Sequence, residues 1–249
     1  MLWSMKKNAY RAQQKAMKVA SIVLPFPVPL LLSGPGSVRQ LAENITNRGR
    51  KHVLVVTDKV LMDLKLLDGL FESLQQNGIR YTVFDDVQPN PTIANVEEGR
   101  KIYKANNCDS LLAFGGGSPM DCAKAIGARI SNPYFSVRHM KGLFRVFLPI
   151  PPLFCVPTTA GTGSETTIVA VISDPETHEK FAINDLKLIP KVAVLDPELM
   201  TGLPPHITAT TGMDALTHAV EAYIGLNGTQ FTDEHAESAT RLIFENLET

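Results

Sequence analysis

The chain has 249 residues, of which 44% are hydrophobic and 20% are charged, and its formal net charge is −1. This composition is typical of a globular protein with a buried core, and the length allows one large domain, or one domain and part of another. The nearly neutral charge argues against a nucleic-acid-binding protein and against a polybasic membrane-binding one.

The cysteines and the first residues indicate the compartment. Cys108, Cys122 and Cys155 have no CxxC spacing, so a disulfide framework is not expected and a reducing compartment is favoured. Residues 1–28 are interpreted as an N-terminal extension that starts with an exposed amphipathic helix over residues 1–18. The apolar stretch that follows is short and interrupted by prolines, so it cannot span a bilayer. We expect a cytoplasmic protein with no membrane partner.

Apolar runs and helical patterns alternate along most of the chain. The runs that predict strands lie at residues 29–32, 53–57, 81–84, 111–114, 153–156 and 192–195. The helical patterns lie at residues 38–48, in the stretch that ends at Gly78, at residues 92–105, and from Pro119 onward. This alternation is typical of βαβ units around a mostly parallel sheet. Residues 168–172 and 180–183 flank an Asp-Pro pair and predict a hairpin, and residues 132–145 predict a loop.

The pattern changes after Glu198. No strand is predicted beyond that residue, and helical patterns cover residues 211–223 and the stretch that starts at Thr232. We therefore predict an α/β domain over residues 29–198 and an all-α domain over residues 199–249.

Three consecutive glycines follow the predicted strand at residues 111–114: Gly115, Gly116 and Gly117. Ser118 then occupies an N-cap position, Pro119 the first helical position, and Asp121 completes the spacing of a capping box. A strand, a glycine turn and a helix aim free backbone N–H groups at a phosphate. The alternative is a turn that only holds the helix against its strand, and both interpretations stay open at this point.

Three further residues are candidates for a nucleotide site, each with a structural alternative. Asp58 ends a predicted parallel strand, where ligands gather in open α/β sheets, and can bind a ribose diol or cap a helix. Asn90 lies between two prolines and can simply hold its own turn. Lys180 can reach into a cleft or lie on the surface of the hairpin.

Asp214 and His218 are candidate metal ligands. Their spacing of four residues places a carboxylate and an imidazole on one helix face, one turn apart. A divalent metal needs such converging oxygen and nitrogen donors, but a charge pair on a solvated face has the same spacing. Glu221 extends this face as a possible third ligand. Two residues alone do not complete a catalytic site, which takes at least three protein ligands.

Together these motifs resemble the iron-containing (group III) alcohol dehydrogenase family. The signatures are GGGSPMDCAKAIG at residues 115–127, PTTAGTGSE at 157–165 and GMDALTHAVEAYI at 212–224. Shorter pieces occur in the same order, with TDK at residues 57–59, PNPT at 89–92 and LPP at 203–205. The likeness extends from about Pro29 to about Glu245 and leaves residues 1–28 uncovered.

The resemblance implies a dinucleotide-binding α/β domain, an all-helical metal-binding domain and an active site between them. In this sequence it implies the following roles: Asp58 would meet the adenosine ribose, Asn90 would help to close the nucleotide cleft, Gly116, Gly117 and Ser118 would bind the pyrophosphate, Thr158, Thr159, Thr162 and Lys180 would line the cofactor channel, and Asp214 and His218 would bind the metal. The family takes two further histidine ligands from later in the helical domain, and no matching position is found before Thr249.

The implied activity is metal-assisted hydride transfer between NAD(H) and a small primary alcohol or aldehyde, with Fe²⁺ or Zn²⁺ as the metal. We expect a homodimer or a higher homo-oligomer. One alternative is a glycerol dehydrogenase or a dehydroquinate-synthase-like enzyme, which shares the fold. The other is a dinucleotide-binding module without catalysis, which the incomplete ligand set makes a serious alternative for this chain.

Overall fold

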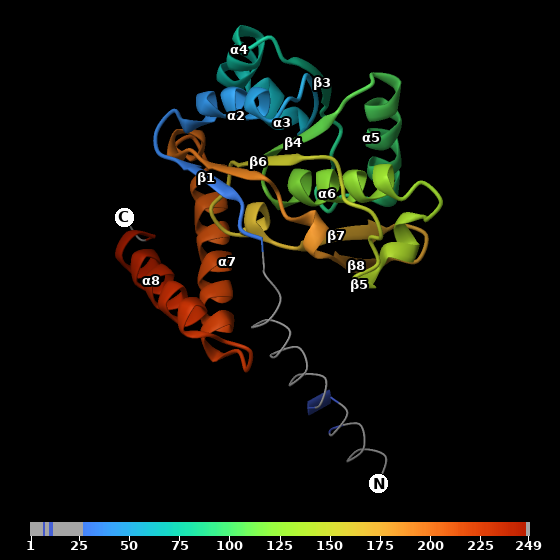
Figure 1. Ribbon diagram of the computed structural model, residues 1–249. Helices are drawn as coiled ribbons and strands as arrows, with labels where there is room; N and C mark the ends of the chain where they lie inside the picture. The colour runs from blue at the N-terminus through green and yellow to red at the C-terminus, as the bar shows by residue number, and fades with distance from the viewer. Residues whose placement is uncertain (1–6, 8–9, 12–26, 248–249) are drawn as a thin grey trace. The chain divides into compact units, whose positions relative to one another are not determined.

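The computed structural model describes residues 7, 10–11 and 27–247 (Figure 1). The chain divides into two compact units, one of which is Val28–Pro204, and the other combines Met1–Pro27 with Pro205–Thr249. The amphipathic helix predicted over residues 1–18 lies outside the described residues, except for Lys7, Tyr10 and Arg11. The predicted domain boundary near Leu199 remains a prediction.

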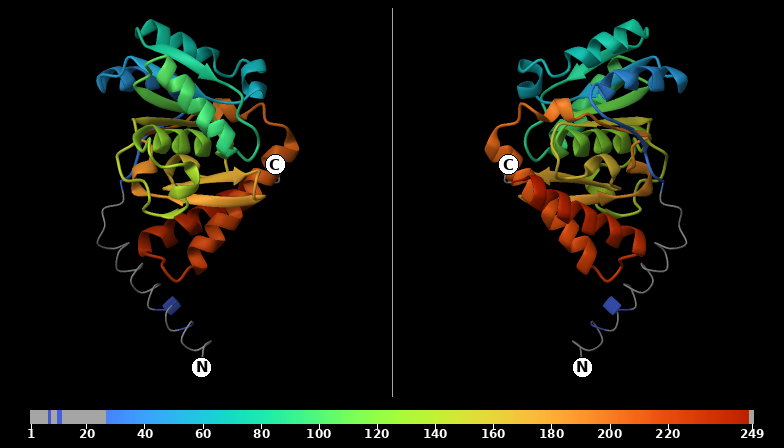
Figure 2. Two further views of the ribbon diagram at one scale, coloured as in Figure 1. Left: turned by 90° about the vertical axis from the view of Figure 1, so that its right-hand side faces the viewer. Right: turned by 90° about the vertical axis from the view of Figure 1, so that its left-hand side faces the viewer.

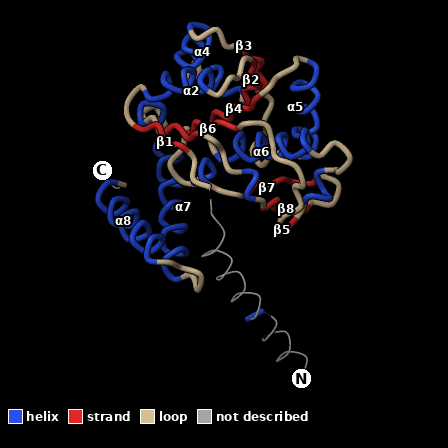
Figure 3. Tube along the Cα trace, in the orientation of Figure 1, coloured by secondary structure: helices blue, strands red, loops and turns tan. Residues whose placement is uncertain are grey.

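The unit Val28–Pro204 is built around a parallel sheet of six strands, as the alternating pattern predicts. The strands are β1 (Leu30–Ser33), β2 (His52–Val56), β3 (Arg80–Phe84), β4 (Ser110–Gly115), β6 (Leu153–Pro157) and β9 (Val192–Leu195). Their order across the sheet is β1-β9-β6-β4-β2-β3, and every neighbouring pair is parallel. The strands are coloured red in Figure 3. The carboxyl ends of the strands therefore share one edge, where open α/β sheets bind their ligands.

Both faces of this sheet are covered, which is why its strands are almost continuously apolar. On β4, Leu111 and Ala113 point into one core and Leu112 and Phe114 into the other. The first core is shared with α5 (Ile93–Ala105) and α6 (Gly117–Ser131). The second is shared with the short helix η1 (Ser37–Gln40) and with α2 (Leu41–Asn47), α3 (Lys59–Asp63) and α4 (Asp68–Gln76).

A small second sheet packs beside α6. The predicted hairpin is confirmed, because β7 (Val169–Asp174) and β8 (Glu179–Asn184) pair in antiparallel register. The prediction of a plain loop over residues 132–145 is wrong, since η2 (Val137–Met140) and the short strand β5 (Gly142–Leu143) lie there and β5 joins β8. These elements are too short to show a sequence period. They are held by tertiary contacts, such as the bond of 2.9 Å from Arg138 Nη2 to Asp174 Oδ1. The remaining short helices are η3 (Ser164–Thr166), η4 (Leu186–Leu188) and η5 (Pro197–Met200).

From Pro205 onward, the other unit contains a pair of helices, α7 (Pro205–Ile224) and α8 (Gln230–Asn246), which lie side by side (Figure 2). Helix α7 starts six residues before the predicted stretch at residues 211–223, with Pro205 in the first helical position, where a missing N–H is tolerated. Thr229 caps α8 with a capping box. No strand follows Glu198 in the described residues, as predicted. Within those residues no helix has both the length and the apolar character needed to cross a membrane.

Candidate nucleotide-binding site

The three glycines lie where β4 ends and α6 begins, at the carboxyl edge of the sheet. We call residues Gly115–Gly117 the glycine loop. Gly115 has φ +143°, and a Cβ added there would lie 2.7 Å from Pro119 Cγ, so only glycine fits. The chain turns into the helix immediately afterwards, with Gly116 as N-cap and no side chain capping the first turn. The first backbone N–H groups of α6 are therefore not satisfied by a side-chain cap and can bind an anion.

Two details predicted for this turn are wrong. The helix begins at Gly117 rather than Pro119, so Ser118 is not its N-cap. Asp121 does not form a capping box, because its Oδ1 accepts from Ser164 Oγ at 2.9 Å and its Oδ2 from Val171 N at 3.0 Å. The backbone geometry of Gly115 and these distant partners override the local preference of serine for the N-cap.

Residues 158–164, which we call the hydroxyl loop, follow β6 and pack directly on the glycine loop. Thr158 is buried, and its N–H donates to Gly115 O at 3.1 Å. A Cβ added to Gly116 would lie 3.2 Å from Thr159 Oγ1, and one added to Gly117 would lie 3.0 Å from Thr162 Cγ2. Strands β4 and β6 are neighbours in the sheet, so the two loops leave the same edge side by side. The glycines allow the approach of the threonines.

Asn90 joins two other predicted residues that are distant in sequence. Its backbone N–H donates to Ser118 Oγ at 3.2 Å, and its Oδ1 accepts from Lys180 Nζ at 2.9 Å. Asn90 adopts the left-handed conformation, with φ 60°, which asparagine tolerates better than most residues. Lys180 is exposed on β8, yet its amine is directed to the start of α6 through Asn90. The structure thus brings Asn90, Ser118 and Lys180 together.

Asp58 follows β2, the strand next to β4, and it caps a helix, which was the structural alternative to binding a ribose. Its Oδ1 accepts from Leu61 N at 3.0 Å, which makes Asp58 the N-cap of α3. Its neighbour Lys59 pairs with Asp86 at 2.9 Å on the exposed surface. A cap of this kind leaves the carboxylate at the carboxyl edge of the sheet, and contact with a ribose stays a prediction.

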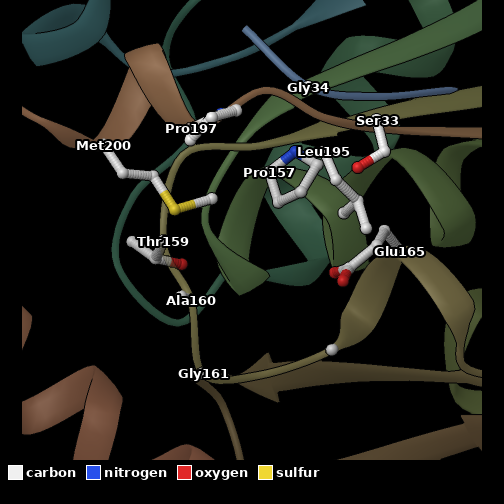
Figure 4. Close-up of a pocket in the computed structure, with 11 residues that line it drawn as sticks. Ser33, Gly34, Pro157, Thr159, Ala160, Gly161, Glu165, Leu195, Pro197 and Met200 are labelled. Carbon is white, nitrogen blue, oxygen red and sulfur yellow. The ribbon is translucent and has the colours of Figure 1, made fainter. Parts of the chain in front are cut away.

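A cavity of about 460 Å³ lies at the carboxyl ends of β1, β6 and β9 (Figure 4). Thr159 lines it and also contacts the glycine loop, so the cavity adjoins the site described above. The carboxylate of Glu165 is turned toward its interior, and burial raises the pKa of this carboxyl. The rest of the lining is mostly apolar, with Pro157, Leu195 and Met200 among its members. Sequence reasoning did not single out Glu165, although it ends the PTTAGTGSE motif.

Lys124 is the other residue that sequence reasoning missed. It lies in α6 with no exposed surface, and burial lowers the pKa of its amine. One signal in the sequence could have indicated its burial. Lys124 stands in the segment CAKAIGA, where all the other residues are small or apolar, so this part of the predicted helix has no polar face.

The predicted metal ligands Asp214 and His218 both lie on α7, one turn apart, with Asp214 half-buried and His218 exposed. Glu221, the possible third ligand, is exposed on the same helix. His235 on α8 has its Nδ1 2.8 Å from Phe231 O, within its own helix. In the part of the chain that the structure describes, no group of three or more His, Cys, Asp or Glu residues could hold a metal ion.

Known proteins resemble the chain in both units. The family described as iron-containing alcohol dehydrogenase matches residues 29–197, and the C-terminal domain of the Fe-containing alcohol dehydrogenase family matches residues 208–249. Alcohol dehydrogenase 4 of Schizosaccharomyces pombe is 41% identical over 233 residues, which make up 94% of this chain and 54% of that protein.

Solved structures of similar proteins share the fold. The crystal structure of a 1,3-propanediol oxidoreductase matches with a TM-score of 0.87 and 40% identity, over 90% of this chain and 59% of that one. A sulfoacetaldehyde reductase from Bifidobacterium kashiwanohense, solved in complex with NAD⁺, matches with a TM-score of 0.82 and 32% identity, over 90% of this chain and 60% of that one. The chain spans about half the length of the curated relatives it matches.

Proposed function

Because the chain belongs to the iron-containing alcohol dehydrogenase family, we propose that its α/β unit binds NAD(H) across the glycine loop and the hydroxyl loop. The reaction in this proposal interconverts a small primary alcohol and the corresponding aldehyde. Bound NAD supplies the hydride acceptor, and the chain's own residues bind and orient it. The relatives named as an alcohol dehydrogenase, an oxidoreductase of 1,3-propanediol and an aldehyde reductase support this class of reaction.

The observation that carries the proposal is that three segments distant in sequence meet at the start of α6: the turn at Asn90, strand β8 at Lys180, and the hydroxyl loop. The uncapped N-terminus of a helix favours an anion by about 0.3–2 kcal/mol, and here it adjoins glycines without Cβ atoms. In the proposal Gly116, Gly117 and Ser118 hold the pyrophosphate. Asn90 and Lys180, already bonded to each other, supply positive charge and closure beside it. Thr158, Thr159 and Thr162 flank the cofactor from the hydroxyl loop.

Asp58 is the residue that selects NAD(H) over NADP(H) in this proposal. A carboxylate accepts hydrogen bonds from a ribose diol but repels a 2′-phosphate. At an effective dielectric constant near 20, the repulsion between two close unit charges amounts to about 4 kcal/mol before screening by salt. Asp58→Asn removes the charge and keeps a good N-cap for α3. We expect this variant to improve NADPH affinity relative to NADH, and Asp63→Asn, at an exposed position in the same helix, to leave the ratio unchanged.

Asp214 and His218 are the first two ligands of the proposed metal, Fe²⁺ or Zn²⁺, since both ions accept carboxylate and imidazole donors. The described residues do not complete such a site, because a catalytic metal needs at least three protein ligands. No step of the reaction is therefore assigned to a metal bound by these residues alone.

We propose the domain organisation, the location and the oligomeric state from membership of the same family. In this proposal residues 29–198 form the cofactor domain, residues 199–249 belong to an all-α domain, and residues 1–28 are an extension. The three free, buried cysteines fit a cytoplasmic location, and the assembly is a homodimer or a higher homo-oligomer.

The experiment that tests the proposal is NADH binding by the 249-residue chain, followed by nucleotide fluorescence. Gly117→Val places a branched side chain against Thr162 and over the start of α6, so the dissociation constant of NADH should rise at least about ten-fold, or 1.4 kcal/mol. The matched control is Gly69→Val, because a Cβ at Gly69 would meet a single atom at 3.8 Å, Arg39 Nε. Equal NADH affinity in the folded Gly117→Val variant, or no binding by the unmutated chain, contradicts the proposal.

A further inference from the structure

A buried ammonium group ties α6 to the hydroxyl loop. The Lys124 side chain is fully buried, and its Nζ donates to three backbone carbonyls: Ser164 O at 2.6 Å, Thr167 O at 3.0 Å and Val169 O at 2.9 Å. Two hydroxyl oxygens are equally close, Ser164 Oγ at 3.0 Å and Thr167 Oγ1 at 2.8 Å. An ammonium has three protons, so these five oxygens share them and enclose the group completely.

Asp121, one turn before Lys124 on the same helix, fastens the same stretch of chain. Its two carboxylate oxygens accept from Ser164 Oγ at 2.9 Å and from Val171 N at 3.0 Å. Lys124 and Asp121 together therefore bind the last residue of the hydroxyl loop and the chain that leads into β7. The other end of the loop is held by the bond from Thr158 N to Gly115 O.

Stability alone does not account for this arrangement. Burial lowers the pKa of Lys124 and raises that of Asp121, which means that the surroundings disfavour both charges. Removing a charged group from water costs free energy that its hydrogen bonds have to offset. What an enclosed ammonium does provide is one defined loop conformation, because any other leaves several buried polar groups without partners.

We propose that Lys124 and Asp121 are positioning residues that set the hydroxyl loop at the distance from the glycine loop needed to bind the dinucleotide. Neither side chain touches the nucleotide in this proposal. They act through Thr159 and Thr162, which contact Gly116 and Gly117. The inference rests on the proposed NAD(H) site. It adds that the affinity for the complete dinucleotide depends on these hydrogen bonds of Lys124 and Asp121 to residues 164–171, which we call the clamp.

The clamp makes a specific prediction about parts of the ligand. In the proposed site, AMP would reach only Asp58 and the glycine loop, whereas NADH would also extend along the hydroxyl loop. Lys124→Met keeps an unbranched side chain but removes the ammonium. We expect its dissociation constant for NADH to rise at least about ten-fold, while that for AMP stays within about three-fold. A general loss of stability would weaken both ligands alike, so the ratio of the two constants separates positioning from folding.

The experiment measures both constants by calorimetry for the unmutated chain, Lys124→Met and Lys104→Met, with amide hydrogen exchange as a second readout. Lys104 is exposed on α5 and serves as the matched control, expected to behave as the unmutated chain. Exchange over residues 158–167 should become faster in Lys124→Met while β2 stays protected.

If Lys124→Met does not fold, Thr167→Val carries the test, because it removes one hydroxyl acceptor of the clamp and preserves the shape of the side chain. We expect it to weaken NADH about three-fold with AMP unchanged. An unchanged NADH-to-AMP ratio in the folded variant overturns the clamp and leaves the NAD(H) site standing. Absence of NADH binding in the unmutated chain overturns the proposed function itself.

Discussion

The two units of the molecule differ in how far they bury their own apolar side chains. In the unit Val28–Pro204, two cores line the faces of the sheet, and large residues such as Phe114 and Phe154 have no exposed surface. In the described part of α7 and α8, only two side chains are buried, Ala219 and Ala236. Large apolar residues of these helices and of the turn between them are instead exposed: Met213, Val220, Tyr223, Ile224, Leu226, Phe231, Leu242 and Phe244.

This difference in burial determines which kind of site each unit can form. The proposed nucleotide site consists of loops at one edge of a sheet, and the sheet with its two layers of helices is sufficient to hold those loops. A metal site in a helical domain needs donors from several helices that face a common interior. Two helices with little shared interior offer a donor pair on a single face, Asp214 and His218, and no third ligand in the described residues.

The largest expected effect concerns catalysis. We expect the purified 249-residue chain to bind NADH but to show little or no alcohol-dependent NAD⁺ reduction with added Fe²⁺ or Zn²⁺. A fully coordinated metal polarises the alcohol, and a closed site holds the alcohol against the nicotinamide. Without these two contributions, most of the rate enhancement available to such an enzyme is lost. A turnover of about 1 s⁻¹, which is ordinary for an enzyme, would show that the chain itself supplies further metal ligands besides Asp214 and His218. Glu221→Gln and His235→Gln would then be the first variants to test.

The second effect compares the two units by the same substitution. Phe154→Ala in β6 removes a fully buried ring and should lower the free energy of unfolding of the α/β unit by about 3–5 kcal/mol. Phe244→Ala in α8, where 71% of the residue is exposed, should change stability by less than about 0.5 kcal/mol. Urea denaturation followed by far-ultraviolet circular dichroism measures both. Similar losses in the two variants would mean that α8 is packed as tightly as the sheet.

Much of the fold could be predicted because its causes are local. The strands at residues 53–57 and 192–195 are short apolar runs bounded by polar residues, the pattern of strands covered on both faces. Thr92 ends the predicted turn at residues 89–92 and caps the helix that follows, where its side chain accepts from the N–H of the third residue on. In each case the signal and its structural consequence lie within a few residues of each other.

The parts of the site that could not be predicted depend on contacts between distant residues. Ser118 is a better N-cap residue than Gly116, but the backbone of Gly115 starts the helix earlier. Asp121 has the spacing of a capping box, yet its partners lie 43 and 50 positions later in the chain. The partners of Lys124 lie 40 to 45 positions away. No local pattern encodes such pairs, so the clamp is visible only in the folded structure.

The third effect tests the exposed face of the helical pair. Apolar residues gathered on one exposed surface favour association, so we expect the chain to self-associate at micromolar concentration. The double variant Val220→Ser, Ile224→Ser should raise the dissociation constant of this association at least about ten-fold. Val60→Ser, at an exposed apolar position in α3, is the matched control and should have no effect. Sedimentation velocity reads the outcome, and a monomeric unmutated chain would contradict the expectation.

The smallest effect is a pH dependence confined to the α/β unit. His52 begins β2, is almost completely buried, and places its Nε2 2.9 Å from Thr82 Oγ1. Burial, and secondarily the charge of Arg80, lowers the pKa of His52 below 6.5, although Asp109 opposes the shift. The folded protein therefore resists a proton that the unfolded chain takes up, and stability should decrease as pH falls through 6.5.

The variant His52→Gln removes this titration and keeps a polar side chain near Thr82. We expect the free energy of unfolding of the unmutated chain to fall between about pH 7.5 and about pH 5 relative to that of the variant. Urea denaturation at each pH provides both curves. Parallel curves over this range would show that His52 titrates as freely in the folded unit as in the unfolded chain. A steeper fall in the unmutated chain would support the interpretation that the α/β unit excludes charge from its sheet. The helical pair buries only Ala219 and Ala236 in the described residues, so no comparable dependence is expected there.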